Sequence, residues 1–317
     1  MSKTTSGSII EVKNLTKKYK ELTAVDNLSF AVKEGEILGL LGPNGSGKST
    51  TINCILSLLS HDSGDIKIFG KTMTPDSFDI KRQIGVVFQD VAVFDELTVW
   101  ENVNYFCGLY ISDKKTCEQY TEEALKLVGL EDFKKFIPKK LSGGLLRRLN
   151  IACGIAHKPK LIFLDEPTVA VDPQSRNNIL DGIKKLRDDG ATIVYTTHYM
   201  EEVEILCDEI IILDHGKIIA SGTKDSLKDL AKIKETISVE AANISPKAQD
   251  EISKLRDVTS VKYADGVLVL SYKDAHKNLA ELVNLLEKNK INYNRIYSER
   301  PTLNDVFLEL TGKELRD

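Results

Sequence analysis

The chain has 317 residues, of which 42% are hydrophobic and 28% are charged, and its net charge is −4. This composition is that of a globular protein with a sizeable core, and the length suggests two domains or one large domain with an appendage. The negative net charge argues against the general basic field with which proteins bind nucleic acids, so we expect no nucleic-acid partner.

The five cysteines are scattered and form no CxxC pair, which predicts reduced thiols in a reducing compartment rather than disulfides or a zinc site. The N-terminal segment MSKTTSGSII lacks the apolar stretch of a signal peptide. The longest apolar runs, LIFL and IIIL, are too short to cross a bilayer. We therefore expect a cytoplasmic protein that does not cross a membrane by itself.

Hydrophobic periodicity predicts the order of helices and strands. Residues 8–41 alternate like an antiparallel β-region, and the helix that follows runs from Ser49 to about Leu59. Two long helical segments after Thr98 predict a helical insertion over about 90–157. Strands such as LIFLDE and ATIVYTTH then alternate with helices of crossover length, which indicates a parallel sheet with helices on its faces.

The remainder of the chain reads as βαββαβ, the order of a ferredoxin-like α+β domain. We place the domain boundary near residue 231, so that an α/β domain occupies 1–230 and an accessory domain 231–317. No chemistry is identifiable in the second domain, for which a structural appendage, a dimerisation aid and a regulatory element stay open.

The segment GLLGPNGSGKST has the spacing of a phosphate-binding loop and lies between an apolar strand and a helix, as this motif requires. The backbone N–H groups of the loop can surround phosphates, Lys48 can reach the β- and γ-oxygens, and the Ser49 hydroxyl can coordinate Mg²⁺. A chance glycine-rich turn is the alternative. The predicted nucleotide-binding residues of the loop are Gly42, Pro43, Asn44, Gly45, Ser46, Gly47, Lys48, Ser49 and Thr50.

The strand KLIFLDE delivers Asp165 and Glu166 to its carboxyl end. There Asp165 can hold Mg²⁺ and Glu166 can orient or deprotonate water, because two adjacent carboxylates need a cation or water to offset their desolvation. A solvated strand end is the alternative interpretation.

The segment KKLSGGLLRRLN places Ser142, Gly143 and Gly144 at the start of a helix. Ser142 is a good N-cap, so a capped helix after a tight turn is one interpretation. A phosphate site is the other, since a helix start offers free N–H groups and the positive end of its dipole.

Together these motifs resemble an ATP-binding-cassette (ABC) ATPase over residues 8–230. The resemblance implies that Tyr19 stacks on adenine, that Gln89 contacts Mg²⁺ and water, and that His198 holds the γ-phosphate. It also implies that Asp172 belongs to the loop after the Asp-Glu strand, and that LSGG is the family signature. ATP and Mg²⁺ are the implied cofactors.

The resemblance further implies a head-to-tail dimer, homomeric or heteromeric, in which ATP lies between the phosphate loop of one subunit and the signature helix of the other. Glu166 would then act as general base or water-orienting residue, ATP would close the dimer, and hydrolysis would reopen it. Donors from both subunits suit a loose phosphoryl-transfer transition state.

The C-terminal segment YSERPTLNDVFLELTGKELRD and the segment around the Asp-Glu strand resemble ATPases of ABC-2-type drug and antibiotic exporters, the daunorubicin- and linearmycin-resistance type. In that branch the membrane permease subunits are separate chains, which would hold this chain at the cytoplasmic face of the cell membrane. Val91–Trp100 is then a candidate docking surface for these subunits, or else core of the helical insertion.

Two residues depart from the family pattern: Leu145 stands where the signature usually has glutamine, and Ala170 where this branch commonly has glycine. We still expect hydrolysis, with an altered rate or dimer affinity. A soluble ABC ATPase acting on ribosomes or DNA and an importer ATPase are the alternative functions. Both are disfavoured, by the single cassette without a basic face and by the βαββαβ appendage.

Overall fold

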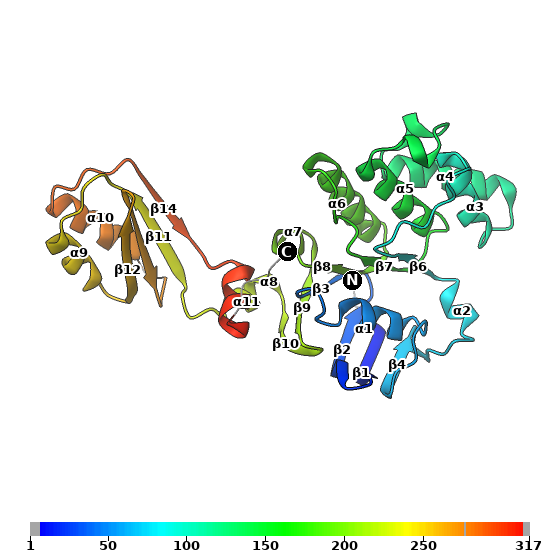
Figure 1. Cartoon of the computed structure of the whole chain (residues 1–317), viewed down its shortest axis with the longest axis horizontal. Helices are drawn as coiled ribbons and strands as arrows, with labels where there is room; N and C mark the ends of the chain where they lie inside the picture. The colour runs from blue at the N-terminus through cyan, green and yellow to red at the C-terminus, as the bar shows by residue number, and fades with distance from the viewer. Residues whose placement is uncertain (1–6, 276, 313–317) are drawn as a thin grey trace, which may run out of the picture. The chain divides into compact units, whose positions relative to one another are not determined.

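The computed structural model describes residues 7–275 and 277–312. They form two compact units, of which the first ends at Thr223 and the second begins at Lys224 (Figure 1). The boundary predicted near residue 231 lies a few residues later, beyond the short helix α8 (Lys224–Lys228) that opens the second unit.

A six-stranded sheet forms the centre of the first unit, and its strands from β9 to β6 are parallel. In spatial order the strands are β10 (Lys217–Gly222), β9 (Glu209–Asp214), β3 (Ile37–Leu41), β8 (Thr192–Thr197), β7 (Leu161–Asp165) and β6 (Ile84–Val87). Every residue of β3, β7 and β8 is buried, which is typical of parallel strands covered on both faces.

The prediction of an antiparallel region over 8–41 is wrong for the last strand of that region, β3. β3 pairs in parallel with β8 and β9 at the centre of the main sheet. Because all five of its residues are buried, β3 has no alternation of exposed and buried positions to distinguish it from its neighbours in the sequence.

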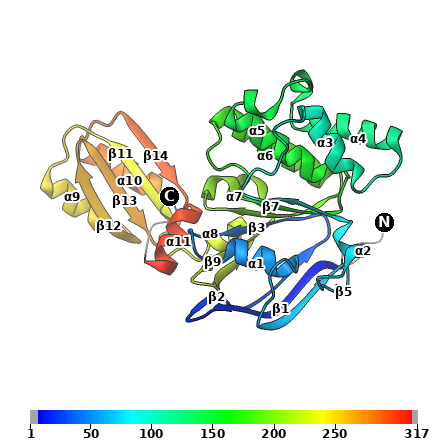
Figure 2. The same ribbon diagram turned by 45° about the vertical axis from the view of Figure 1, so that its right-hand side comes forward.

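A second, antiparallel sheet of the first unit packs on the parallel sheet through α1 (Lys48–Ile55). Its strands are β2 (Leu22–Lys33), β1 (Ser8–Tyr19), β4 (Ser63–Ile68) and β5 (Lys71–Thr72), in that spatial order. Figure 2 shows α1 between the two sheets. Its buried Ile52 and Ile55 share one hydrophobic core with residues of both sheets, such as Ile10 and Phe163. This packing fixes the start of α1, which carries Lys48.

The other face of the parallel sheet is covered by helices (Figure 2). These are α5 (Gly143–Ile155), α6 (Pro173–Asp188) and α7 (Met200–Leu206). The helices α3 (Val99–Gly108) and α4 (Lys114–Leu127) pack on α5, and α2 (Phe78–Lys81) and the 3-10 turns Glu131–Phe133 and Pro138–Lys140 lie in the connections. Helices α3 to α5 occupy the region predicted as a helical insertion.

The second unit has the βαββαβ order of the predicted ferredoxin-like domain. Its elements are β11 (Glu235–Glu240), α9 (Pro246–Ser253), β12 (Val258–Ala264), β13 (Val267–Tyr272), α10 (Asn278–Lys288) and β14 (Arg295–Glu299), followed by α11 (Leu303–Thr311). The antiparallel sheet has the order β12-β13-β11-β14. The predicted fold class is therefore confirmed for both parts of the chain.

Among residues 7–275 and 277–312, no helix combines the length and the apolar character that a membrane crossing requires.

Candidate active site

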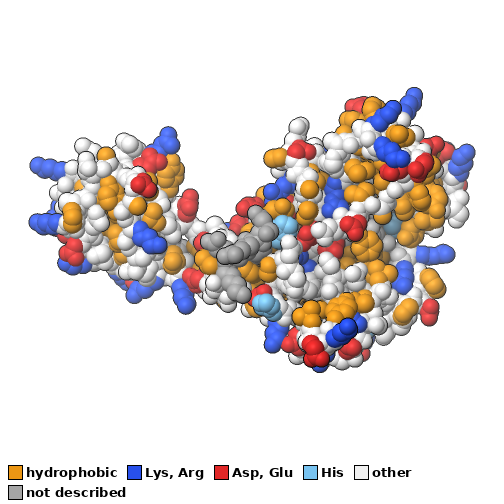
Figure 3. Space-filling view, in the orientation of Figure 1, with side chains coloured by type: hydrophobic (Ala, Val, Ile, Leu, Met, Phe, Trp, Pro, Cys, Tyr) orange, Lys and Arg blue, Asp and Glu red, His pale blue; other side chains and the backbone are white. Residues whose placement is uncertain are grey.

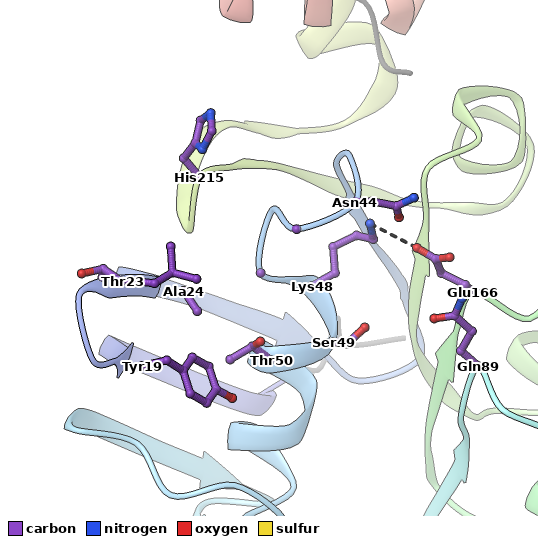
Figure 4. Close-up of a pocket in the computed structure, with 13 residues that line it drawn as sticks. Tyr19, Thr23, Ala24, Asn44, Lys48, Ser49, Thr50, Gln89, Glu166 and His215 are labelled. Atoms are coloured by element: carbon purple, nitrogen blue, oxygen red, sulfur yellow. Dashed lines mark ion pairs between the residues drawn. The ribbon is translucent and has the colours of Figure 1, made fainter. Parts of the chain in front are cut away.

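A cavity of about 450 Å³ lies where β3 ends and α1 begins (Figure 4). The residues that line it come from the β1–β2 hairpin, the phosphate loop and the ends of β6, β7 and β9. They are Tyr19, Leu22, Thr23, Ala24, Asn44, Gly45, Gly47, Lys48, Ser49, Thr50, Gln89, Glu166 and His215. The cavity therefore brings together nine of the residues predicted from the sequence.

Lys48 is the buried cation at this site. Its side chain is 4% exposed, and its Nζ donates to the carbonyl oxygens of Gly42 at 2.8 Å and Pro43 at 3.2 Å. The same Nζ lies 3.2 Å from Oε1 of Glu166, the ion pair drawn in Figure 4. Lysine is rarely buried to this extent without partners, and here three oxygens satisfy its three donors.

The loop before Lys48 is held in a conformation that requires glycine at its last position. Gly47 has φ 103°, and a β-carbon there would lie 2.4 Å from the carbonyl oxygen of Ala24. The hydrogen bond from the Thr51 amide to the Gly47 carbonyl begins the helix at this point. The free N–H groups of the first turn and the helix dipole therefore point into the cavity, an arrangement that suits an anion.

Glu166 follows β7 directly and has φ 48°, in the left-handed region. This conformation costs a non-glycine residue on the order of 1 kcal/mol and has to be held by its surroundings. Thr196 on the neighbouring strand β8 holds the amide: the Glu166 N–H donates to Thr196 Oγ1 at 3.0 Å and to the Thr196 carbonyl at 3.2 Å. Strain of this kind is concentrated at functional sites.

Asp165 and His198 flank Glu166. The Thr196 hydroxyl donates to Asp165 Oδ1 at 2.5 Å, and Asp165 is 5% exposed. Nδ1 of His198 lies 3.5 Å from Oε2 of Glu166. This nitrogen is buried and has no hydrogen-bond partner in the described part of the chain, so the approach to Glu166 is not a hydrogen bond.

The side chains suited to a cation are oxygen donors. Ser49 and Gln89 line the cavity, and Asp165 is buried at the end of β7 beside Glu166. One carboxylate, one hydroxyl and one amide fit Mg²⁺, which takes few protein ligands and completes its shell with phosphate and water oxygens.

Gln89 lies on an exposed loop after β6. The backbone of this loop accepts hydrogen bonds from a buried arginine that the sequence analysis missed. Arg147 on α5 is 4% exposed and donates to the carbonyl oxygens of Gln89 at 2.6 Å and Glu166 at 2.7 Å. Burial lowers the pKa of Arg147, and the carboxylates of Asp165, Asp90 and Glu166 counteract this effect. The sequence offered one indirect signal: Gly144, Arg147 and Asn150 follow one another at helical spacing, and the structure shows that they lie on the buried face of α5.

Ser142 and Asp172 lie outside the cavity, at the starts of two neighbouring helices. Ser142 caps α5 by accepting from the Leu145 amide at 3.3 Å, and Asp172 caps α6 by accepting from the Ser175 amide at 2.9 Å. The bonds from Ser175 hold the pKa of the Asp172 carboxyl below its ordinary value. The capped-helix interpretation of Ser142 agrees with its contact, whereas the cap at Asp172 was not predicted from the sequence.

The two signature glycines differ in their surroundings. A β-carbon on Gly143 would meet no atom within 4 Å, whereas one on Gly144 would lie 2.7 Å from Ser175 Oγ and 2.9 Å from Asp172 Oδ2. Room for a phosphate at the helix start therefore explains only one of the two glycines. At Gly144 the close packing of α5 on the start of α6 already requires glycine.

A buried carboxylate that the sequence analysis also missed lies on α7, the helix that follows His198 in the chain. Glu202 on α7 is fully buried and accepts from Tyr195 Oη at 2.7 Å, Thr197 Oγ1 at 2.8 Å and Arg176 Nε at 2.7 Å. These bonds connect β8 and α6 around the segment that carries His198. The sequence signal was weak, because EE at 201–202 reads as an exposed helix start.

A phosphate loop after the central strand of a parallel sheet, an Asp-Glu pair ending a neighbouring strand, and a serine-capped glycine pair between them in sequence define a P-loop ATPase of the ATP-binding-cassette class. Comparison with known proteins agrees with this class. The family model "ABC transporter" matches residues 25–169, and the model "ATP-binding protein DrrA1-3-like, C-terminal domain" matches residues 222–311.

The linearmycin resistance ATP-binding protein LnrL of Bacillus subtilis (strain 168) is 39% identical, over 98% of this chain and 100% of that protein. The daunorubicin/doxorubicin resistance ATP-binding protein DrrA of Streptomyces peucetius is 34% identical, over 97% of this chain and 94% of that protein. A post-hydrolysis dimer of the ATP-binding cassette MJ0796 bound to ADP and Pi superposes with a TM-score of 0.62 and 32% identity, over 68% of this chain and 98% of that chain.

The chain therefore belongs to the family of ABC transporter ATP-binding subunits, and it is a transporter ATPase. The assignment made from the sequence motifs, including the drug- and antibiotic-resistance branch, is confirmed.

Proposed function

We propose that this chain hydrolyses ATP at the cavity around Lys48 and thereby drives export through separate ABC-2-type membrane subunits. The observation that carries the proposal is the buried Lys48–Glu166 ion pair beneath a phosphate loop. Lys48 binds the β- and γ-phosphate oxygens, which compete with Glu166 for the same ammonium group. Glu166, once released, orients or deprotonates the attacking water.

The other residues in the cavity, together with Asp165 and His198 beside Glu166, bind and position the nucleotide in this proposal. Tyr19 is 45% exposed at the end of β1 and offers a ring face on which adenine stacks. Nδ1 of His198 is buried beside Glu166 without a hydrogen-bond partner among the described residues, and in this proposal the imidazole binds the γ-phosphate. Ser49, Gln89 and Asp165 would hold Mg²⁺, which neutralises developing phosphate charge when it is bound.

The second half of the site comes from another subunit in this proposal. Ser142 is exposed at the start of α5, and the space around Gly143 is open, so this helix start can approach a phosphate bound by a partner. Asp172 lies beside it at the start of α6. A head-to-tail dimer, of identical or related chains, places each signature helix against the ATP of the other subunit.

The docking surface for the membrane subunits lies on the loop after Gln89 and on α3. The segment Val91–Trp100 divides into two parts, since Val91 and Phe94 are exposed whereas Val99 is fully buried. Tyr105 on α3, also exposed, packs edge-on against Phe94 at a ring distance of 5.0 Å. Figure 3 shows hydrophobic side chains gathered on this face. Such a patch beside Gln89 suits a permease helix at the cytoplasmic face of the membrane.

We infer that the exported compound is a drug-, antibiotic- or lipid-like molecule, as the names of the relatives suggest. A chain with one cassette and a DrrA-like C-terminal domain fits this function better than it fits a soluble ABC ATPase or an importer subunit. Co-purification from membranes tests this choice: recovery of a chain with about six bilayer-length apolar spans supports it, and recovery of ribosomes contradicts it.

The catalytic assignment is tested by Glu166→Gln. This variant loses the base and the ion pair but keeps the shape of the side chain, so we expect turnover to fall about 10²–10³-fold while ATP binding persists. Size-exclusion chromatography with Mg-ATP is then expected to show a doubled mass. A variant that turns over ATP normally would contradict the role of Glu166, and a monomer at saturating ATP would contradict the dimer.

A further inference from the structure

Arg147 connects three parts of the active site through a single buried side chain. From the second turn of α5 its Nη1 donates to the carbonyl oxygens of Phe88 at 3.1 Å and Gln89 at 2.6 Å, and its Nη2 donates to the carbonyl oxygen of Glu166 at 2.7 Å. No atom of Arg147 lines the nucleotide cavity as the described residues form it. Its contacts are with the backbone that carries the proposed catalytic side chains.

The same face of α5 holds the loop after β6 at a second point. One turn beyond Arg147, the buried Asn150 accepts from the Ala92 amide at 3.0 Å and donates to the Phe88 carbonyl at 3.4 Å. The loop that carries Gln89 is thus bonded to α5 on both sides of Gln89. Arg147 extends this connection to Glu166, at the end of the adjacent strand β7.

The hydrogen bond from Arg147 to Glu166 is made to a residue with a strained backbone. Glu166 has φ 48°, its amide is held by Thr196, and its carbonyl is held by Arg147. A planar guanidinium presents two nitrogens in a fixed fork and can hold both carbonyls at once, whereas an ammonium group is a single point donor. The orientation of the Glu166 carboxylate therefore depends on this fork.

We propose that Arg147 is a positioning residue for ATP hydrolysis: it fixes the loop of Gln89 and the backbone of Glu166 relative to each other and to the signature helix. This inference rests on the proposed roles of Gln89 and Glu166. The residue acts on the chemical step through the placement of these two side chains and makes no contact with the nucleotide.

The test is Arg147→Lys, and the chain offers a matched control in the next residue. Arg148 is on the same helix and also donates to two carbonyl oxygens, those of Val128 at 2.9 Å and Gly129 at 3.2 Å, away from the cavity. Both bonds come from Nη1, so Arg148→Lys repeats the chemical change in the helical region alone, without a fork that spans two elements. Arg147→Gln and Arg148→Gln form a second, neutral pair.

We expect Arg147→Lys to lower kcat about 10- to 100-fold, the loss that a misplacement of about 1 Å produces, and to leave KM for Mg-ATP within about twofold. Arg148→Lys is expected to keep kcat within about twofold of the unchanged chain. The same substitution is also made in the Glu166→Gln variant, whose slow phosphate release is followed over hours. There Arg147→Lys is expected to lower the residual rate by less than about threefold, because the effects of substitutions at residues that act together are not additive.

Three results would overturn the inference. The first is an Arg147→Lys kcat equal to that of Arg148→Lys. The second is an equal fold-loss in the Glu166→Gln background, which would show an effect independent of Glu166. The third is a failure of both Arg147 variants to fold when both Arg148 variants fold, since the residue would then be structural. A Glu166→Gln chain with normal turnover would instead refute the proposed function, so the two failures are distinguishable.

Discussion

The two halves of the proposed ATP site, both present on this chain, are built in different ways. The half around Lys48 and Glu166 consists of buried side chains that satisfy one another inside the first unit. The half around Ser142 and Asp172 consists of two helix starts whose capping side chains are already bonded to their own helices. The first half acts through side-chain chemistry, whereas the second acts through backbone groups whose place is set by the packing of α5 on α6.

The largest effect is expected in the first half, from Lys48→Ala. The change removes the phosphate-binding cation and leaves the buried Glu166 carboxylate without its partner, so we expect kcat/KM for ATP to fall about 10²–10³-fold or more. Steady-state phosphate release measures the loss.

Lys160→Ala is a suitable control for Lys48→Ala. This lysine is exposed and lies just before β7, at the end of the strand opposite Glu166. A Lys48→Ala chain that matched the Lys160→Ala chain in turnover would remove the basis for placing the γ-phosphate at this cavity.

In the second half, the two glycines separate packing from nucleotide access. Gly144→Ala places a β-carbon 2.9 Å from Cβ of Ser175, and we expect the resulting overpacking to lower the free energy of unfolding by about 1–3 kcal/mol. Gly143→Ala adds a methyl group in open space, so its free energy of unfolding should change by less than about 0.5 kcal/mol. Its turnover should nevertheless fall, because in the proposed dimer the methyl group would face the ATP of the partner subunit.

Denaturant unfolding and ATPase assays on the same preparations check both glycine variants. If Gly143→Ala retained full turnover and ATP-dependent dimerisation, the signature helix would not approach a nucleotide as closely as proposed. If Gly144→Ala were as stable as the unchanged chain, the packing of α5 on α6 would be looser than the distances indicate.

This difference between the halves also explains what the sequence could predict. The phosphate loop, the Asp-Glu strand end and the βαββαβ order are local patterns, and the structure places Lys48 beside Glu166 as the motifs require. Arg147 and Glu202 were missed because no local motif marks them. Arg147 bonds to Gln89, 58 residues earlier, and Glu202 bonds to Arg176, 26 residues earlier. The parallel pairing of β3 was missed because a fully buried strand does not reveal the direction of its neighbours.

A smaller effect is expected from Leu145→Gln, which restores the residue usual in the family signature. Leu145 is half-buried in the first turn of α5, and its amide bonds to Ser142. Glutamine adds a polar side chain without disturbing this bond, so we expect kcat to change by no more than about fivefold, corresponding to one neutral hydrogen bond. Steady-state ATPase assays at saturating Mg-ATP measure this change. An effect as large as that of Lys48→Ala would mean that the second half also acts through side-chain chemistry.

The smallest effect is expected from Ala170, in the loop that leads to Asp172. Ala170 is exposed and has φ 59°, a conformation that glycine adopts more readily than alanine. Ala170→Gly removes about 1 kcal/mol of left-handed strain and adds about 0.4–1 kcal/mol of unfolded-chain entropy, so the free energy of unfolding should rise by less than about 0.6 kcal/mol. Ala170→Val, which is β-branched, should lower it instead. Urea unfolding of the three chains ranks them, and a valine variant more stable than the glycine variant would show that this loop adopts another backbone conformation in solution.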